Sequence, residues 1–274
     1  VQGLDLPGRG RLLLIDLGGG RNRLGGSALA QVFSQIGDVT PDVDDPTLLA
    51  RAFSAIQELI AVRLVTAGHD RSDGGLITTL LEMAFAGNCG IDVALGAEPG
   101  TDAISRLFSE ELGLVLEVDE ADVETALGAF RSADVPCEVI GRTVIEPEVR
   151  IVVDGAELLS ADMRDLRDLW EATSFRLELE QADPDCVAAE RDGLRHRTAP
   201  PYALSFIPQP TAPEIMIRDS KIPVAILREE GSNGDREMAA LACAAVSPSP
   251  IAAPMAPNPI AIPPPANADT CTQV

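Results

Sequence analysis

Short apolar runs alternate with longer amphipathic segments over residues 1–173, and this alternation constrains the fold more than any other feature. The run at residues 12–17 is almost wholly aliphatic and too short for a typical helix, so it predicts a buried strand. Apolar residues three or four positions apart predict helices that bury one face. The predicted strands are residues 12–17, 91–95, 114–118, 137–144, 149–153 and 157–159, and the predicted helices are residues 29–36, 49–64, 77–86, 101–108, 123–130 and 163–173. This order predicts one α/β (α+β) domain over residues 1–173.

Two of these helices have apolar residues on one face. In the first helix they are Leu29, Val32, Phe33 and Ile36. In the second helix they form a narrow stripe of Leu49, Phe53, Ile56, Ile60 and Leu64. We expect this second stripe to face the core, because an amphipathic helix packs its apolar side against a neighbouring element.

The periodic pattern weakens after residue 173. Acidic and proline residues predict a helix followed by an exposed linker over residues 174–220. Residues 221–240 contain one strand pattern and a glycine turn that starts a helix, too little for a domain. Residues 241–274 are rich in proline and alanine, which predicts a disordered tail with polyproline II character.

The overall charge is strongly negative, with 43 acidic against 21 basic side chains. Nucleic acids and anionic membranes carry dense negative charge themselves, so general binding to either is disfavoured. Any phosphate ligand has to be held locally, by backbone N–H groups, a metal ion or a few arginines.

The cysteines indicate a reducing compartment. They are odd in number and widely spaced without a CxxC pair, which predicts free thiols rather than zinc ligands or disulfides. No apolar run approaches the roughly 18 residues of a membrane span and no signal-peptide pattern is present, so we expect a cytoplasmic protein. The five cysteines are Cys89, Cys137, Cys186, Cys243 and Cys271.

Residues 68–76 concentrate groups that bind phosphate and metal ions. Asp70, Ser72 and Asp73 lie in a polar loop that ends at paired glycines and the predicted start of a helix. The N-terminus of a helix presents N–H groups to phosphate oxygens, and a neighbouring carboxylate suits a hard cation such as Mg²⁺. The alternative interpretation is that one of the three residues is an ordinary helix cap and the glycines form a turn.

Other polar groups are weaker candidates. The glycine-rich residues 18–26 match no phosphate-binding fingerprint, so a turn is favoured, although Arg21 and Arg23 keep a phosphate role open. A loop could aim Glu110 or Glu111 into a cleft, but two solvated glutamates are the simpler expectation. Two further side chains, those of Glu82 and His196, are expected to be solvated.

Five stretches taken together resemble the large, single-chain phosphoribosylformylglycinamidine synthases of purine biosynthesis. The resemblance covers residues 12–240, and the most specific stretch runs from Val224 to Met238, where it is similar to the beginning of a glutamine amidotransferase domain. The stretches are residues 23–31, 69–76, 81–90, 169–175 and 224–238. Their order and length identify the chain as a member of this family.

The resemblance implies a partial chain. Residues 1–173 are similar to the C-terminal half of the second aminoimidazole-ribonucleotide-synthetase-like repeat, a sheet packed with helices, and residues 221–240 to a truncated amidotransferase start. The family converts formylglycinamide ribonucleotide to its amidine with ATP, Mg²⁺ and ammonia released from glutamine. Its pattern places a Mg²⁺-coordinating aspartate at Asp70 and a nucleotide-contacting serine at Ser72.

Parts of the family's machinery are missing from the sequence. The other metal ligands belong to the N-terminal half of the repeat, and the amidotransferase needs a cysteine nucleophile with a histidine and a glutamate. Cys243 and Cys271 lack the glycine-rich surroundings and the following histidine. We therefore expect no catalytic residue here and no turnover by the isolated chain. The alternative is a non-catalytic module that binds nucleotide or packs against the missing half-repeats.

Overall fold

The computed structural model describes residues 4–37, 39–96, 100, 102–197, 205–206 and 238. Contacts divide the chain into two units, Val1–Ala199 and Pro200–Val274, and the helices and strands below all lie in the first. The predicted amidotransferase start and tail lie outside the described residues, apart from Met238.

Seven strands form one mixed sheet in the order β2-β4-β1-β5-β3-β6-β7. Neighbouring strands are antiparallel except for the parallel pair β3 and β6. The strands are β1 (Gly10–Asp16), β2 (Val65–Asp70), β3 (Gly90–Leu95), β4 (Gly113–Asp119), β5 (Glu138–Val144), β6 (Glu148–Val153) and β7 (Ala156–Asp162).

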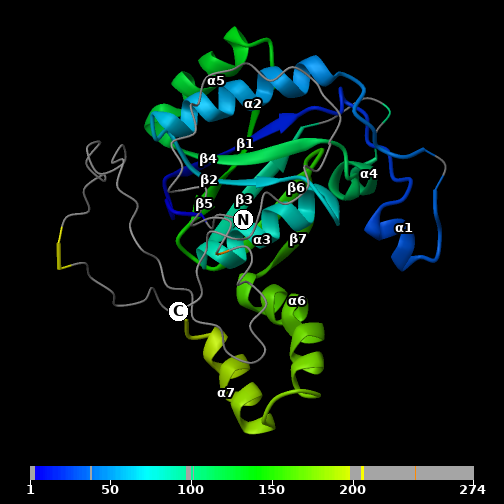
Figure 1. The fold of residues 1–274 in the computed structure, drawn as a ribbon, viewed down its shortest axis with the longest axis vertical. Coiled ribbons are helices and arrows are strands. Elements are labelled where there is room, and N and C mark those ends of the chain that lie inside the picture. Colours follow the sequence, from blue (N-terminus) through cyan, green and yellow to red (C-terminus); the bar gives the residue numbers. More distant parts are fainter. Residues whose placement is uncertain are drawn as a thin grey trace, which may run out of the picture. The chain divides into compact units, whose positions relative to one another are not determined.

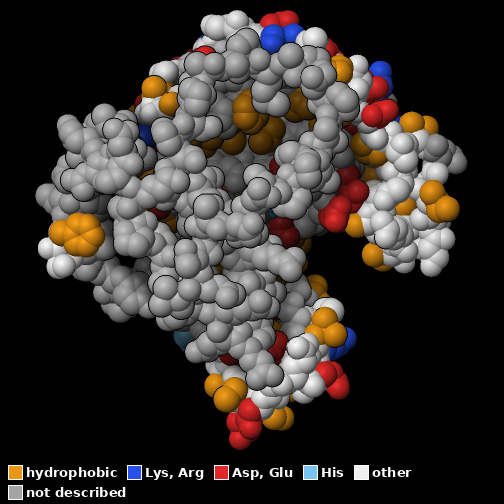
Figure 2. All heavy atoms as spheres, in the orientation of Figure 1, with side chains coloured by type: hydrophobic (Ala, Val, Ile, Leu, Met, Phe, Trp, Pro, Cys, Tyr) orange, Lys and Arg blue, Asp and Glu red, His pale blue; other side chains and the backbone are white. Residues whose placement is uncertain are grey.

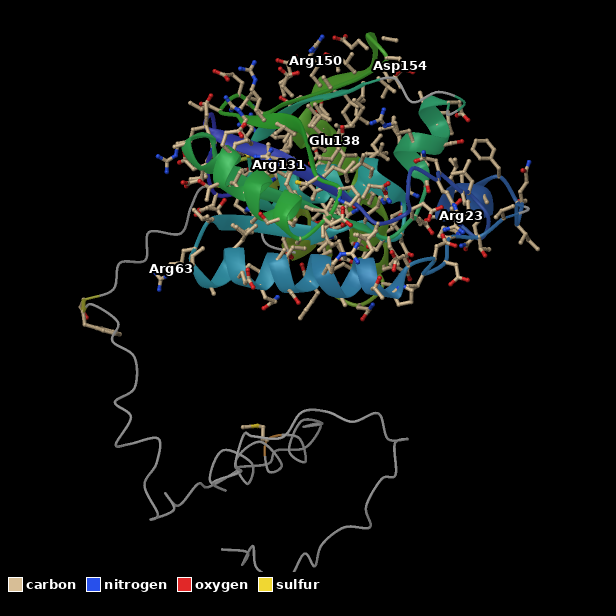
Figure 3. The ribbon with its side chains drawn as sticks, turned by 90° about the horizontal axis from the view of Figure 1, so that it is seen from above. Arg23, Arg63, Arg131, Glu138, Arg150 and Asp154 are labelled. Atoms are coloured by element: carbon tan, nitrogen blue, oxygen red, sulfur yellow. The ribbon has the colours of Figure 1, made fainter. Side chains whose placement is uncertain are left out.

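Helices cover both faces of the sheet (Figure 1). The helices are α1 (Ala28–Val32), α2 (Pro46–Ala61), α3 (Gly75–Gly87), α4 (Ala103–Phe108), α5 (Val123–Ser132), α6 (Met163–Glu178) and α7 (Pro184–Leu194). One hydrophobic cluster lies between the sheet and α2 with α5, and a second lies between the other face and α3, α4 and the start of α6. In Figure 3, Arg63 marks the C-terminal end of α2 and Arg131 lies on α5.

The predicted α/β class is confirmed, and β1 shows why its sequence is a continuous apolar run. Leu12 and Leu14 pack in one cluster while Leu13 and Ile15 pack in the other. Successive side chains of a strand point to opposite faces, so a central strand covered by helices on both sides needs apolar residues at every position.

The first predicted helix is shorter than its sequence pattern and leaves most of its apolar residues exposed. The helix α1 has only five residues and buries none of them. Val32, Phe33 and Ile36 are 78%, 67% and 80% exposed. The chain leaves the helix at Ser34, whose φ of 55° lies in the left-handed region, before these residues meet a neighbouring element.

The second helix forms as predicted, but its buried side differs from the predicted stripe. Ala52, Ala55, Ile56 and Leu59 face the sheet, and small alanines let the helix approach it closely. Three residues of the predicted stripe are exposed instead: Leu49 (37%), Phe53 (64%) and Ile60 (46%). Only the centre of the stripe, Ile56, is buried as expected.

The strand β2 was not predicted. Residues 65–70 pair with β4 at one edge of the sheet, so the first part of the predicted polar loop is strand and the turn begins at Arg71. The helix α6 extends to Glu178, beyond the predicted 173, and α7 lies in the predicted helix-and-linker region. The domain boundaries at 173, 220 and 240 stay predictions.

Candidate nucleotide and metal site at the turn between β2 and α3

The turn between β2 and α3 carries the two predicted ligand residues. Asp70 is the last residue of β2, and Ser72 lies between it and the first residue of α3, Gly75. Both residues are exposed, and 72% of the Asp70 side chain is accessible to solvent. The carboxylate and the hydroxyl are thus available to a ligand on the surface.

The paired glycines of this turn are required by its geometry. Gly74 and Gly75 have φ values of 84° and 73°, a left-handed conformation that other residues rarely adopt. A Cβ on Gly74 would lie 2.2 Å from Thr78 Oγ1, and a Cβ on Gly75 would lie 2.6 Å from the carbonyl carbon of Phe108. Glycine therefore lets the start of α3 lie directly against the end of α4.

The helix-cap interpretation of this turn is wrong. The N-cap of α3 is Gly74, and no side chain accepts a hydrogen bond from the first N–H groups of the helix. Asp70, Ser72 and Asp73 therefore do not serve as caps. The N–H of Gly75 donates instead to the backbone carbonyl of Ser72 at 2.9 Å, and the N-terminus of α3 keeps the positive end of its helix dipole, which attracts anions.

A glutamate from another loop holds the turn in place. The Oε1 atom of Glu110 accepts hydrogen bonds from the backbone N–H of Gly74 and of Ala28, each at 2.8 Å. This half-buried carboxylate therefore joins the turn to the start of α1. The expectation that Glu110 is simply solvated is wrong.

Arg71 is a structural member of the turn. Its side chain is buried, and its Nε donates to the carbonyl of Glu111 at 2.6 Å. Its Nη2 donates to Asp16 Oδ1 at 2.7 Å and to the carbonyl of Leu112 at 2.9 Å. These bonds tie the end of β2 to the end of β1 and to the loop before β4.

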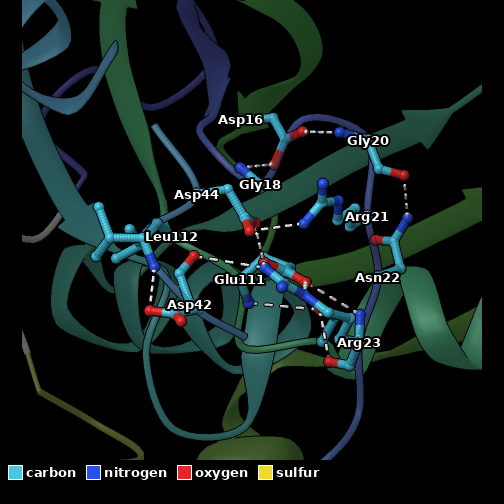
Figure 4. Close-up of polar contacts among 12 residues, drawn as sticks. Asp16, Gly18, Gly20, Arg21, Asn22, Arg23, Asp42, Asp44, Glu111 and Leu112 are labelled. Atoms are coloured by element: carbon cyan, nitrogen blue, oxygen red, sulfur yellow. Dashed lines mark hydrogen bonds and ion pairs between the residues drawn. The ribbon is translucent and has the colours of Figure 1, made fainter. Parts of the chain in front are cut away.

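Glu111 is buried and paired with Arg23, which also makes the expectation of a solvated Glu111 wrong (Figure 4). The two Glu111 oxygens accept from Arg23 Nε at 2.5 Å and from Arg23 Nη2 at 2.7 Å. Arg23 Nη2 also donates to Asp44 Oδ2 at 2.8 Å. The side-chain hydrogen bond to Glu111 raises the pKa of Arg23 above its ordinary value.

The glycine-rich residues 18–26 form a turn held by carboxylates. Asp16 accepts from the backbone N–H of Gly18 at 3.2 Å and of Gly20 at 2.9 Å (Figure 4). Arg21 Nη1 pairs with Asp44 Oδ1 at 2.7 Å. Since the two arginines that kept a phosphate role open are both paired with acidic groups, the structure favours the turn interpretation.

His69 connects the turn to α3. Its ring is only 5% exposed, with Nε2 at 2.7 Å from Glu82 Oε2 and Nδ1 at 3.2 Å from Asp70 Oδ1. The Glu82 side chain is 26% exposed, so the expectation of a solvated residue is wrong for Glu82. His196, by contrast, is exposed, as the sequence predicted.

An apolar groove of about 430 Å³ lies beside this turn, between α2 and the edge of the sheet. Its walls include the exposed Phe53 and Ile60 of α2, and His69 and Asp70 lie at one part of its lining. Figure 2 shows hydrophobic side chains at the place that α2 occupies in Figure 1. The candidate site therefore lies between this apolar groove and the N-terminus of α3.

Three further observations concern the described residues. They contain no group of three His, Cys, Asp or Glu side chains that could hold a metal ion. None of their helices is both long and apolar enough to cross a bilayer. Three of the predicted free thiols are confirmed as free: those of Cys89, Cys137 and Cys186.

A family model for the C-terminal domain of AIR synthase related proteins matches residues 12–154, slightly more than half of the chain. The chain belongs to this family. The match covers β1 to β6 and includes the turn with Asp70 and Ser72. The predicted similarity to this half of the synthetase repeat is thereby confirmed.

Curated relatives from this family are much longer than the chain. It is 52% identical over 231 residues to a probable phosphoribosylformylglycinamidine synthase, chloroplastic/mitochondrial, of Arabidopsis thaliana. It is 52% identical over 239 residues to the phosphoribosylformylglycinamidine synthase of Homo sapiens. These alignments cover 84% and 85% of this chain but 16% and 18% of the relatives.

A solved structure has the same fold. PurL of T. maritima, complexed with FGAR, matches with a TM-score of 0.50 and 19% sequence identity, over 60% of this chain and 29% of that chain. At this identity the match supports the sheet with its helix layers as an AIR-synthase-like fold.

Sequence reasoning found the turn but missed most of what holds it. The sequence predicts a solvated Glu82 because it lies on the polar face of an amphipathic helix, and solvated Glu110 and Glu111 because they lie in a polar segment before a strand. Their partners lie 13 to 88 positions away in the sequence. The only available signal was the position of Glu110 and Glu111, two acids directly before a predicted buried strand.

Proposed function

We propose that the chain is part of a phosphoribosylformylglycinamidine synthase. It would supply the C-terminal half of the second synthetase-like repeat and the start of the glutamine amidotransferase domain. The observation that carries this proposal is the 52% identity over 231 residues to the probable Arabidopsis thaliana synthase. The motif that carries Asp70 and Ser72 supports the same assignment, because it lies in the matched domain.

The whole enzyme would convert formylglycinamide ribonucleotide to formylglycinamidine ribonucleotide. ATP would transfer its γ-phosphoryl group to the amide oxygen of the substrate, forming a phosphate leaving group and ADP. Ammonia released by hydrolysis of glutamine to glutamate would then form the new carbon–nitrogen bond. The carbon–oxygen bond breaks in that step, and inorganic phosphate leaves with the oxygen.

This chain's part in that chemistry is to hold the nucleotide's phosphates. The N-terminus of α3 offers N–H groups and the positive end of its dipole, and Ser72 would donate its hydroxyl to a phosphate oxygen. Asp70 would bind Mg²⁺, whose role is to neutralise phosphate charge. Mg²⁺ is commonly held by one or two carboxylates together with phosphate oxygens and water, so the single exposed carboxylate fits such a site.

The exposed apolar surface supports the proposed packing against the family's other half-repeats. Phe53 and Ile60 on α2 and Val32 and Phe33 beside α1 are all at least 46% exposed, although they are large hydrophobic residues. Apolar surface of this kind is typical of an interface. For the location we retain the cytoplasm, on the strength of the free thiols, while noting that the Arabidopsis relative is named as chloroplastic/mitochondrial.

Calorimetric titration with ATP and Mg²⁺ tests the site. We expect Asp70→Asn to weaken binding by at least tenfold and Ser72→Ala to weaken it by a smaller factor. Asp73→Asn is the matched control, because Asp73 is an exposed aspartate on the same turn. Equal affinities for Asp70→Asn and Asp73→Asn would contradict the assignment of Asp70.

A second experiment separates the enzyme role from a non-catalytic module. The isolated 274 residues should form no amidine from ATP and glutamine, because the family resemblance places the other metal ligands in a different half-repeat and matches only the start of the amidotransferase domain. A chimaera that carries this chain's matched 231 residues inside the Arabidopsis thaliana relative should restore growth of cells lacking the synthase. Failure of the chimaera, with nucleotide binding intact, would favour the packing or nucleotide-binding module, which the exposed apolar groove also suits.

A further inference from the structure

Two carboxylates flank the buried ring of His69. Glu82 approaches from α3, at 2.7 Å from Nε2, and Asp70 approaches from the next residue of β2, at 3.2 Å from Nδ1. Carboxylate oxygens only accept hydrogen bonds, so the imidazole donates wherever one of its nitrogens carries a proton. The ring therefore links a half-buried carboxylate on a rigid helix to an exposed carboxylate on the turn.

The contact with Glu82 fixes the ring. The Glu82 side chain is 26% exposed and the His69 ring is 5% exposed, so little water competes for this bond. The backbone that follows His69 is also held, because Thr79 Oγ1 donates to the carbonyl of Asp70 at 3.2 Å and the N–H of Arg71 donates to the carbonyl of Gly113 at 2.8 Å. His69 thus presents Nδ1 from a fixed position.

The contact with Asp70 adds little to the stability of the fold. With 72% of the Asp70 side chain exposed, water and salt screen any charge interaction there. Its backbone is already held by Thr79. What the contact changes is the side-chain rotamer, because an exposed aspartate otherwise samples several orientations.

We propose that His69 is a positioning residue that, anchored by Glu82, orients the Asp70 carboxylate for a divalent cation. The inference rests on the proposed function, in which Asp70 binds the cation that accompanies the nucleotide. Residues that orient a metal ligand through a hydrogen bond typically contribute 10-fold to 100-fold in metal affinity. His69 itself does not contact the cation or the nucleotide in this proposal.

Two amide substitutions separate positioning from structural support. The amide nitrogen of glutamine reaches about as far as Nε2, and that of asparagine about as far as Nδ1. His69→Gln therefore keeps a donor toward Glu82 and loses the one toward Asp70, whereas His69→Asn does the reverse. We expect His69→Gln to weaken Mn²⁺ binding about tenfold in the presence of ATP, with little change in melting temperature. We expect His69→Asn to have a lower melting temperature than His69→Gln and to lose less affinity for Mn²⁺.

Mn²⁺ is the probe, measured by electron paramagnetic resonance of the full 274-residue chain. A nuclear magnetic resonance experiment on chain labelled with ¹⁵N-histidine then shows whether the bound Mn²⁺ lies beside Asp70, while the affinity of His69→Gln at unchanged melting temperature tests the positioning role. The chain has two histidines, and His196→Gln identifies their signals. Mn²⁺ with ATP should broaden the ring signals of His69 and leave those of His196 sharp.

The outcomes distinguish this inference from the proposed function. If the wild-type chain binds no Mn²⁺ with ATP, the assignment of Asp70 is wrong and the role of His69 is overturned with it. If Asp70→Asn loses binding but His69→Gln binds as tightly as wild type, the positioning role alone is overturned. Weakened binding by His69→Gln at unchanged melting temperature supports it.

Discussion

Glu111 accepts two hydrogen bonds from the guanidinium of Arg23, 88 positions away in the sequence. The Glu111 side chain is fully buried, while the Arg23 side chain is 13% exposed. Through this pair the segment with the glycine-rich turn and α1 is fastened to the loop that precedes β4. That loop also supplies Glu110, which holds the turn carrying Asp70 and Ser72.

Glu111→Gln should destabilise the chain strongly, because it breaks the buried half of the ion pair and leaves the guanidinium of Arg23 with the more exposed carboxylate of Asp44. Breaking a buried ion pair by changing one partner typically costs about 3–5 kcal/mol. Urea unfolding monitored by circular dichroism measures the loss. Glu157→Gln is the matched control, since Glu157 pairs with Arg150 while 49% exposed, and it should change the midpoint little. Similar midpoints for the two variants would contradict the structural role of Glu111.

Gly75→Ala should destabilise the chain by about 1–3 kcal/mol or more, because the new Cβ meets both strain and a steric clash. The Cβ would lie 2.6 Å from a backbone carbon of Phe108. Gly19 has a similar φ, 65°, but no atom within 4 Å of its Cβ position. Gly19→Ala therefore reports backbone strain alone. In thermal unfolding, Gly75→Ala should have a clearly lower melting temperature than Gly19→Ala. The reverse order would disprove the close contact between Gly75 and Phe108.

Phe53→Ser should leave the stability of this chain nearly unchanged, although the sequence places Phe53 in an apolar stripe. The residue is 64% exposed on α2, so the substitution removes little buried area. Phe130 on α5 is fully buried, and Phe130→Ala should cost about 3–5 kcal/mol. Chemical denaturation of both variants checks the burial. A large loss for Phe53→Ser would show that another surface covers α2 in solution.

Asp45 should make part of the stability depend on pH. It caps α2, and the hydrogen bond from the Thr47 hydroxyl, followed by that from the N–H of Leu48, lowers the pKa of its carboxyl. A lowered folded-state pKa means that the stabilisation is complete above the unfolded pKa, about 3.9, and is lost as pH falls through the folded value. The stability gap between wild type and Asp45→Ala should therefore be present at pH 7 and close in acid. A gap independent of pH would contradict the charged cap.

Cys89 and Cys137 should resist alkylation in the folded chain. Burial raises the pKa of each thiol to about 12, so almost no thiolate is present near pH 8. Cys186 is exposed and should react with iodoacetamide before either of these two. Peptide mass mapping after a short exposure measures each site, and urea should remove the protection. Early labelling of Cys89 would contradict its burial.

The order of helices and strands was predictable because it depends on local patterns. The run that forms β1 has apolar residues at every position, and the helices α2, α3 and α5 have the period of a helix. The strand β2 was missed, because its sequence from Val65 to Asp70 includes glycine, histidine and aspartate. Its pairing with β4 outweighs these weak local preferences.

The candidate site was predictable from its residue types but not from its surroundings. Asp70, Ser72 and the paired glycines stand together in the sequence, and glycine, aspartate and serine are the residue types expected at a turn that binds phosphate and metal. Whether Asp73 or Ser72 caps the helix depends on the residue at which the helix begins. The N-cap is Gly74, whose left-handed backbone starts the helix after both residues, and the residue types alone do not determine this start.

The sequence by itself determined the α/β class, the buried strand β1 and the turn at Gly74 and Gly75, because each depends on residues that are near neighbours. Only the tertiary structure decided that Glu110 holds this turn and that Glu82 holds His69. An isolated carboxylate looks the same in a sequence whether water or a buried donor satisfies it. Folding decides between the two, because burying such a group is tolerated only where a donor is already in place.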